Sequence, residues 1–220
     1  MSTWVVTGAN RGIGLELCAQ LKARGEGVFA VCRKSSPELD KLGVEVVSGV
    51  DVTSAEGPAL IARALGDRSL DVLVNNAGVL VPDALGALDV ETMRRQYDVN
   101  TLGPLRMTQG LLPKLHAGSK VALVSSRAGS IGDNGSGGLY GYRMSKAALN
   151  MAGVSLARDL APKNVMVVLL HPGFIRTEMT GGAGNDDPPT AAKGLIAQID
   201  ALTPARSGKF FHANGEELPW

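Results

Sequence analysis

Apolar residues along the chain follow two patterns that alternate from one end to the other. Short continuous apolar runs are typical of strands buried on both faces of a parallel sheet, whereas apolar residues at every third or fourth position indicate helices. The predicted strands lie at residues 4–7, 28–32, 44–47, 71–74, 120–124, 165–170 and 209–211. The predicted helices lie at residues 15–25, 53–65, 90–115, 142–160 and 190–202, with a break expected at 100–104.

This alternation predicts an α/β fold: a doubly wound parallel sheet of about seven strands with helices on both faces. At 220 residues the chain is expected to form one domain, residues 1–220, that contains the whole functional site. Ligands of such sheets bind at the carboxyl ends of the strands, where the strand order reverses. The loops that follow the predicted strands are therefore the places where chemistry is expected.

Composition and charge exclude several classes of function. Hydrophobic residues make up 45% and charged residues 20% of the chain, and the net charge of +1 leaves no broad basic face for nucleic acid. No apolar run approaches the roughly 18 residues that span a bilayer, so no membrane partner is expected. The first predicted strand begins three residues after Met1, which predicts a cytoplasmic protein without a cleavable signal.

The two cysteines, Cys18 and Cys32, lack the spacing of metal ligands. Buried reduced thiols are expected rather than a disulfide, in keeping with a cytoplasmic protein. No metal site is expected.

A glycine-rich turn joins the first predicted strand to the first predicted helix. Its candidate cofactor-binding residues are Gly8, Asn10, Arg11, Gly12, Ile13 and Gly14. Glycines permit a tight turn and a close approach of the backbone, and the free amides of the helix N-terminus can meet a pyrophosphate. A glycine-rich turn alone is weak evidence, but its place in the first strand–helix unit is the one that a dinucleotide site requires.

The end of the second predicted strand indicates which dinucleotide is bound. An acidic residue at this point would hold a ribose 2′-hydroxyl, whereas arginine accommodates a 2′-phosphate. The chain has Cys32, Arg33 and Lys34 here and no acid, and Arg11 lies on the same side. We therefore predict NADP(H) in preference to NAD(H). The alternative is that Arg33 and Lys34 are solvated loop charges.

Tyr142 and Lys146 lie four positions apart on a predicted helix, so both side chains face one side. A phenol titrates near ~10, too high for a proton shuttle at neutral pH. A cation about 4 Å away is worth roughly 4 kcal/mol at an effective dielectric of about 20, or about three pKa units before desolvation. The pair predicts a tyrosine that acts as a general acid, although the same spacing also occurs by chance on amphipathic helices.

Several motifs together make the chain resemble a known family. The glycine turn with Thr7 matches the pattern Thr-Gly-x-x-x-Gly-x-Gly, and residues 75–78 after a buried strand read Asn-Asn-Ala-Gly. With Tyr142 and Lys146, the chain resembles the short-chain dehydrogenase/reductase family over essentially its whole length. This implies a single NAD(P)-binding Rossmann domain. The stretches 133–146 and 208–220 look like the C-factor and sniffer-like carbonyl reductase branch of the family.

The resemblance implies a catalytic set of Asn100, Ser126, Tyr142 and Lys146. In the family the serine and the tyrosine act on the substrate carbonyl, the lysine binds the cofactor ribose, and the asparagine carbonyl holds a water that links the lysine to solvent. Ser125 directly precedes Ser126, and residues 133–138 make the separation from Tyr142 longer than is usual. Which serine points inward therefore stays open.

Further cofactor contacts are implied by the resemblance in the later loops. They are Asp51 and Val52 at the adenine, Asn76, Ala77 and Gly78 near the ribose, Tyr142 and Lys146, and Pro172, Gly173, Ile175 and Thr177 toward the nicotinamide carboxamide. Asp51 also suits the start of a helix, where an acid is favoured. His171 is expected to be structural, because Tyr142 and Lys146 already supply proton transfer.

The sequence thus predicts an NADPH-dependent reductase that transfers hydride to an aldehyde or ketone. The main alternative is a C-factor-like NAD(P)-binding signalling protein with little or no turnover, although the intact catalytic set argues against it. A sugar-nucleotide epimerase would need a larger substrate domain, and no Gly-Lys-Ser/Thr sequence for an NTPase follows the glycine turn.

The expected partners are a small carbonyl or alcohol substrate and further copies of the chain. Loops at 79–83, 133–138 and 181–189 are expected to shape the substrate pocket, and the last of them is expected to be mobile. A homodimer or homotetramer is expected through the helices at 90–115 and 142–160. Small residues on the second of these helices would permit the close approach of a partner: Ala147, Ala148, Ala152 and Gly153.

Overall fold

A computed structural model describes residues 1–220 and contains one parallel sheet of seven strands. The strands are β1 (Thr3–Thr7), β2 (Gly27–Val31), β3 (Glu45–Val47), β4 (Leu70–Asn75), β5 (Leu115–Val124), β6 (Met166–His171) and β7 (Phe210–His212). Their order across the sheet is β3-β2-β1-β4-β5-β6-β7. The strand order reverses between β1 and β4, so the doubly wound fold expected from the sequence is confirmed.

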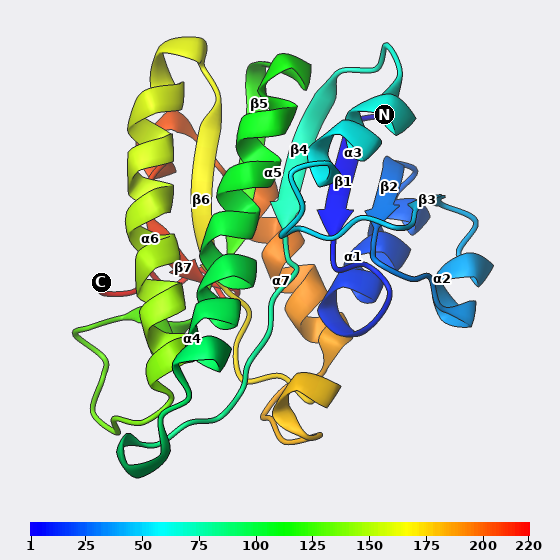
Figure 1. Cartoon of the computed structure of the whole chain (residues 1–220). Coiled ribbons are helices and arrows are strands. Elements are labelled where there is room, and N and C mark those ends of the chain that lie inside the picture. Colours follow the sequence, from blue (N-terminus) through cyan, green and yellow to red (C-terminus); the bar gives the residue numbers. More distant parts are fainter.

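Helices cover both faces of this sheet (Figure 1). They are α1 (Gly12–Ala23), α2 (Pro37–Lys41), α3 (Gly57–Leu65), α4 (Val90–Tyr97), α5 (Gly103–Leu111), α6 (Tyr140–Leu160) and α7 (Pro188–Asp200). Helices α1 and α7 pack together on one face, and α3, α5 and α6 cover the other. No helix combines the length and the apolar character needed to cross a membrane.

The continuous apolar strands of the sequence supply two separate cores. In β1, Val6 joins the core beneath α1 and α7, while its neighbour Val5 joins the core beneath α3, α5 and α6. Successive side chains of a strand point to opposite faces, so a strand covered on both faces needs apolar residues at every position. This is why the strands could be recognised without an alternating pattern.

Several elements differ from those predicted, and three of the differences have a clear local cause. β5 begins at Leu115 instead of Lys120, because its polar, exposed first half pairs with β4 across a shift in register. α3 begins at Gly57 instead of Thr53, because Asp51 holds the Thr53 amide and hydroxyl in a turn. α2 was not predicted, although Ser36 caps it and a proline follows, which is a recognisable helix start.

The predicted break in the helix over 90–115 is present, and it is a π-helical turn at Asp98–Leu102. It begins before the predicted residues 100–104 and separates α4 from α5. The amide of Gly103 bonds to the Asp98 carbonyl, five residues earlier, and Pro104 opens α5. Such turns shift the backbone carbonyls of a helix and are frequent at functional sites.

The loops that follow the strands gather at one edge of the sheet, below the arrowheads in Figure 1. They include the segments after β4 (76–89), β5 (125–139) and β6 (172–187). This is the carboxyl edge, where the sequence predicted the site.

Candidate active site

The glycine turn after β1 is locked against the loop after β4. Asn76 donates from its side chain to the carbonyl oxygen of Thr7 at 2.9 Å, and the Thr7 hydroxyl accepts from the amides of Asn76 and Ala77 at 3.0 and 3.1 Å. Gly8 has φ +67°, and a Cβ added to Gly14 would lie 2.2 Å from the Gly8 carbonyl oxygen. The turn is therefore tightly packed on itself, as glycines permit.

A cavity of about 1200 Å³ extends from this turn to the start of α6. The predicted cofactor residues that line it are Gly8, Asn10, Arg11, Gly12, Ile13, Gly14, Arg33, Lys34, Asp51, Val52, Asn76, Ala77, Gly78, Tyr142, Lys146, Pro172 and Thr177. Four predicted site residues lie outside the lining: Asn100, Ser126, Gly173 and Ile175. The Ile175 side chain is only 3% exposed, so that position can offer a ligand its backbone alone.

Other residues that line the cavity were not predicted. Val79, Arg176 and Glu178 directly follow predicted motifs and could have been found by extending them. Glu91, Arg94 and Arg95 also line it, and they come from α4, which no motif marks. They reach the cavity only because the chain folds back across the carboxyl edge of the sheet.

The end of the cavity near β2 is basic. Arg33 and Lys34 are exposed, and the sequence there contains no acid. Hydrogen bonds from Thr53, with a smaller contribution from the charge of Arg33, lower the pKa of the nearby Asp51 carboxyl. Arg11, predicted to face the same ligand phosphate, forms an ion pair with Glu178 across the mouth of the cavity.

Tyr142 and Lys146 lie at the other end of the cavity, on the first turns of α6, and are 9% and 4% exposed. The Lys146 ammonium donates to the Val124 carbonyl oxygen at 2.8 Å and lies 5.8 Å from the centre of the Tyr142 ring. Burial lowers the pKa of Lys146 to about 8. Burial also raises the pKa of Tyr142, and a hydrogen bond with Ser126 opposes this.

The expectation that Lys146 lowers the pKa of Tyr142 is therefore wrong for this structure. Desolvation dominates for both groups, because both side chains are buried. The Tyr142 phenol is consequently protonated at neutral pH.

The two serines after β5 have different surroundings. The Ser125 hydroxyl is buried and donates to the Asn150 side chain at 2.6 Å. The Ser126 hydroxyl lies near the Tyr142 phenol, where it opposes the effect of burial on the phenol's pKa, and it accepts from the Ala128 amide at 3.1 Å. Ser125 lines the cavity, but its hydroxyl is engaged by Asn150, whereas Ser126 lies near the phenol and outside the lining.

Asn100 lies in the π-helical turn and joins three segments. Its side chain donates to the Val79 carbonyl at 2.8 Å and to the Ser145 hydroxyl at 3.0 Å, and accepts from the Val79 amide at 2.8 Å. A Cβ added to Gly78 would lie 3.3 Å from Asn100 Oδ1 and 3.7 Å from Lys146 Nζ. The π-helical turn, the loop after β4 and α6 are therefore held together beside Lys146.

The N-terminus of α6 is capped by a residue from another loop. Leu139, which precedes the helix, has φ +50° and supplies no side-chain cap. Asp83 accepts from the Tyr140 amide and, at 2.8 Å, from the Gly141 amide. A carboxylate is favoured at this position both as an acceptor and by the helix dipole. Asp83 thereby fixes the helix turn that carries Tyr142.

Replacing Asp83 by alanine is expected to lower the free energy of unfolding by about 1–2 kcal/mol, because two helix amides lose their acceptor. Urea denaturation followed by circular dichroism measures the change. Asp89→Ala is a matched control, because Asp89 caps α4 in the same manner. Both variants should lose stability, and only Asp83→Ala should also slow any Tyr142-dependent reaction; an unchanged urea midpoint would contradict the capping role.

Comparisons with known proteins agree with this geometry. A model of the short chain dehydrogenase family matches residues 2–188. The chain therefore belongs to the short-chain dehydrogenase family. One relative in this family, the 1-hydroxy-2-glutathionyl-2-methyl-3-butene dehydrogenase of Rhodococcus sp. strain AD45, is 46% identical over the full length of both chains.

Two further family members support the predicted branch. The C-signal protein of Myxococcus xanthus is 48% identical over 69% of this chain and 93% of its own. The NADPH-bound carbonyl reductase from chicken fatty liver is 28% identical, with a TM-score of 0.91 over 100% of this chain and 99% of its own. The resemblance to the C-factor and carbonyl reductase branch is thus confirmed.

The surroundings of His171 in this short-chain dehydrogenase agree with a structural role. Burial, together with the nearby charges of Arg127 and Lys146 and the His212 ring, lowers the pKa of His171 to about 3. Its ring meets that of His212 edge to face, with the centroids 5.1 Å apart. His171 is therefore neutral at physiological pH and cannot serve as a proton donor there.

The two cysteines are buried in the fold. Cys18 and Cys32 are buried free thiols, as expected, and burial raises the pKa of Cys18 to about 12.

A Cβ added to Gly153 of α6 would lie 2.7 Å from the Leu169 side chain of β6. Close packing of α6 on the sheet therefore accounts for this glycine, and it is not available to a partner subunit as the sequence suggested.

The segment at 181–189, expected to be a mobile loop, makes several contacts with the residues that precede it. Ile175 and Asp186 form a short parallel bridge, and the Arg176 guanidinium donates to the carbonyls of Gly184 and Asn185 at 3.2 and 2.9 Å. The sequence lacks an apolar period here because these contacts are made by the backbone.

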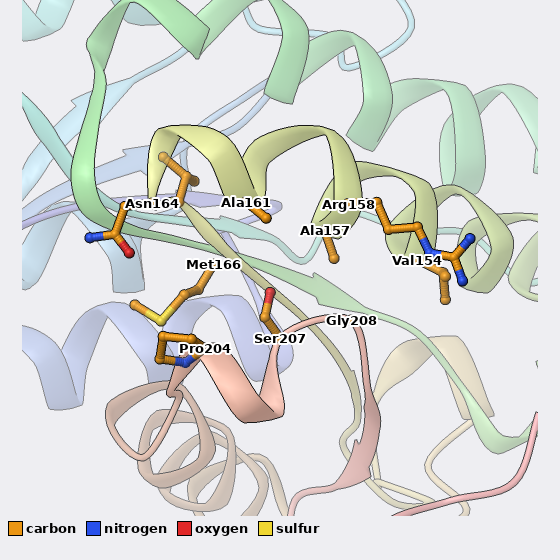
Figure 2. A pocket seen from close by; sticks show the side chains of 10 residues that line it. Val154, Ala157, Arg158, Ala161, Asn164, Met166, Pro204, Ser207 and Gly208 are labelled. Atoms are coloured by element: carbon orange, nitrogen blue, oxygen red, sulfur yellow. The ribbon is translucent and has the colours of Figure 1, made fainter.

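A second cavity, of about 360 Å³, lies near the amino end of β6. Figure 2 shows it between the end of α6, with Ala157 and Arg158, and the segment that holds Pro204 and Ser207. None of the predicted site residues lines it.

Proposed function

We propose that this short-chain dehydrogenase is an NADPH-dependent reductase of aldehydes or ketones with Asn100, Ser126, Tyr142 and Lys146 as its catalytic set. The observation that carries the proposal is that Tyr142 and Lys146 line one end of the large cavity, one helical turn apart, with Ser126 near the Tyr142 phenol just outside the lining. The glycine turn lies along the same cavity.

Each residue then has a separate task. Ser126 donates a hydrogen bond to the substrate carbonyl oxygen, and Tyr142 transfers its proton to that oxygen as negative charge develops there. Lys146 holds the cofactor ribose beside Tyr142, and Asn100 fixes the loop and the helix around Lys146. When bound, NADPH would supply the hydride that reduces the carbonyl carbon.

The residues present fit this cofactor. The glycine turn leaves no room for a Cβ at Gly14, and the N-terminus of α1 has no side-chain cap, so its amides remain available to a phosphate. Arg33 and Lys34 supply positive charge where a 2′-phosphate would lie. The carbonyl reductase from chicken fatty liver, which shares the fold, was solved with NADPH bound. NAD(H) is the alternative cofactor.

Replacing Arg33 by aspartate is expected to reverse the cofactor preference. The added carboxylate repels a 2′-phosphate and accepts from a ribose 2′-hydroxyl, so kcat/KM for NADPH should fall about tenfold to 100-fold while that for NADH rises. Steady-state kinetics with both cofactors measure the ratio. Arg24→Asp is a control for the change in net charge, because Arg24 lies at the opposite end of α1. An unchanged ratio in the Arg33 variant would refute this cofactor assignment.

The experiment that tests the function is NADPH oxidation against a panel of aldehydes, ketones and quinones, with the matching alcohols and NADP⁺ in the reverse direction. The relative from Rhodococcus is named for a substrate with a hydroxyl next to a glutathionyl group. We therefore add 2-glutathionyl alcohols and aldehydes to the panel. Turnover of any panel member that needs Tyr142 supports the proposal, and silence across the panel refutes it.

A second candidate function is NAD(P)-dependent signalling with little or no turnover. Its support is the 48% identity to the C-signal protein over 93% of that protein. Tight NADPH binding combined with no turnover of the whole panel would favour this function.

We further propose that the protein forms a homodimer or homotetramer in the cytoplasm. Apolar side chains are exposed on the outer surfaces of α4 and α6: Val90 at 55%, Tyr97 at 43%, Met144 at 59% and Met151 at 68%. Exposed apolar residues on neighbouring helices favour burial against a second copy. Sedimentation equilibrium gives the number of chains.

A further inference from the structure

The segment between Ser126 and Tyr142 has little of its own to fix its shape. Residues 132–138 include four glycines and are mostly exposed, and Gly137, Gly138 and Leu139 all have positive φ. Yet the first residues of this segment determine where the Ser126 hydroxyl lies, and its last residues lead into the helix turn with Tyr142. A rigid relation between serine and tyrosine therefore needs a contact from outside the segment.

Arg143 provides this contact. Its Nη1 donates to the Ala128 carbonyl at 3.3 Å, near the start of the segment. Its Nε donates to the Gly138 carbonyl at 3.1 Å, and its Nη2 donates to the Ser136 hydroxyl at 2.8 Å, both near the end. One planar guanidinium thus joins the two ends of the segment to α6. Lysine, with its single ammonium, cannot reproduce this fork of donors.

The contact at Ala128 leads directly to the serine. The Ala128 carbonyl accepts from Arg143, while the Ala128 amide donates to the Ser126 hydroxyl at 3.1 Å. The turn formed by Arg127–Gly129 is also pressed against α6, since a Cβ added to Gly129 would lie 2.6 Å from the Lys146 carbonyl carbon. The Ser126 hydroxyl is therefore tied to the helix that carries Tyr142 by a chain of two hydrogen bonds.

We propose that Arg143 is a positioning residue for the reaction: it clamps the segment 127–139 to α6 and so sets the Ser126 hydroxyl against the Tyr142 phenol. This inference rests on the proposed function, because it assumes that Ser126 and Tyr142 act on one substrate oxygen. Other contacts each hold one part of the segment: Arg127 pairs with Asp133, and the Asn150 side chain of α6 donates to the Gly129 carbonyl at 3.4 Å. Arg143 differs from them because it reaches both ends of the segment.

The test compares Arg143→Ala and Arg143→Lys with Arg158→Ala. Arg158 lies on the same helix, is exposed, and borders the second cavity (Figure 2), so it controls for loss of an α6 arginine. A displacement of about 1 Å at a reacting group costs up to about 100-fold in rate. We expect Arg143→Ala to lower kcat about tenfold to 100-fold with an unchanged Kd for NADPH, and Arg143→Lys to recover only part of the loss.

A double-mutant cycle with Ser126→Ala separates positioning from a general loss of structure. If Arg143 acts through Ser126, Arg143→Ala lowers kcat in the wild-type background and has no further effect in the Ser126→Ala background. Hydrogen exchange of the 127–139 peptide gives an independent readout: it should quicken in both Arg143 variants and stay unchanged in Arg158→Ala. Circular dichroism shows whether the variants are folded, and Arg143→Lys serves if Arg143→Ala is not.

The outcomes distinguish this inference from the proposed function. Equal losses from Arg143→Ala in both backgrounds, or wild-type kcat and exchange in both Arg143 variants, would overturn the positioning role while leaving a reductase with Ser126 and Tyr142 intact. Wild-type protein without turnover, or full activity after Ser126→Ala, would overturn the proposed function and this inference with it.

Discussion

Replacing Tyr142 by phenylalanine is expected to lower kcat by about 100-fold to 10,000-fold, because the only proton donor placed beside Ser126 is removed. The ring should keep its place, since Tyr142 is 9% exposed and phenylalanine fills nearly the same volume. The Kd for NADPH, measured by fluorescence titration, should change little. The expected result is thus a protein that binds the cofactor and does not turn over.

Tyr140→Phe is the matched control for this experiment. Tyr140 lies two residues before Tyr142 on the same helix. Asp83 accepts a hydrogen bond from its backbone amide, so the Tyr140 hydroxyl is not needed for the helix cap. Its variant should retain wild-type kcat. If Tyr142→Phe instead kept more than about a tenth of the wild-type rate, general acid catalysis by this phenol would be ruled out.

The raised pKa of Tyr142 has a consequence for the direction of the reaction. A phenol that is protonated at neutral pH can donate to an alkoxide, whereas alcohol oxidation needs the phenolate as a base. Reduction should therefore proceed across the neutral range and weaken as alkaline pH deprotonates Tyr142. The rate of oxidation of the matching alcohol should instead increase as alkaline pH deprotonates Tyr142.

The fold could be read from the sequence because each central strand contains a continuous apolar run. Val5 and Val6 belong to different cores. A polar residue at either position would bury a polar side chain among apolar ones. The same rule fails for the first half of β5, from Leu115 to Ser119, where the pairing is made by the backbone while several side chains are exposed. A pattern of side chains cannot report such a segment.

The cavity lining was predictable where its residues directly follow a strand end or belong to a motif of their own, as Tyr142 and Lys146 do on α6. The glycine turn and the residues 76–78 follow β1 and β4 directly, so motif and topology coincide. Asp83, the cap of α6, and Arg94, which borders the cavity, come from segments far from the residues they serve. Their roles depend on tertiary contacts that spacing does not reveal.

The pKa of Tyr142 was mispredicted for a related reason. Spacing on a helix places Lys146 near Tyr142, but it does not report how deeply the two groups are buried. In the fold, the Lys146 ammonium is directed to the Val124 carbonyl, and desolvation decides the pKa of both groups. The shift of the Tyr142 pKa that was predicted from the charge of Lys146 alone therefore has the wrong direction.

Replacing Lys146 by methionine is expected to abolish turnover and at the same time to stabilise the cofactor-free protein at neutral pH. Loss of the ribose-binding ammonium should lower kcat/KM at least about 100-fold. Methionine has a similar length and no charge to desolvate. The buried ammonium, with its pKa lowered to about 8 from the ordinary 10.5 of a lysine, costs the fold roughly 3 kcal/mol below pH 8.

The pH dependence supplies the decisive measurement. Between about pH 8 and 10.5 the unfolded chain keeps a proton on Lys146 that the folded protein has lost, so the wild-type free energy of unfolding rises through this window. Methionine cannot titrate, so the variant is expected to be about 1–2 kcal/mol more stable at pH 7, after about 1 kcal/mol is subtracted for the hydrogen bond to Val124. This advantage should vanish by about pH 10.

Urea denaturation of wild type, Lys146→Met and Lys163→Met at pH 7, 8.5 and 10 gives the comparison. Lys163 is exposed in the turn after α6, so its variant should track the wild type at every pH. A Lys146→Met protein that is less stable than wild type at pH 7, with the same pH dependence, would show that the ammonium is well solvated. Burial of the Lys146 ammonium would then carry no cost in the free energy of unfolding.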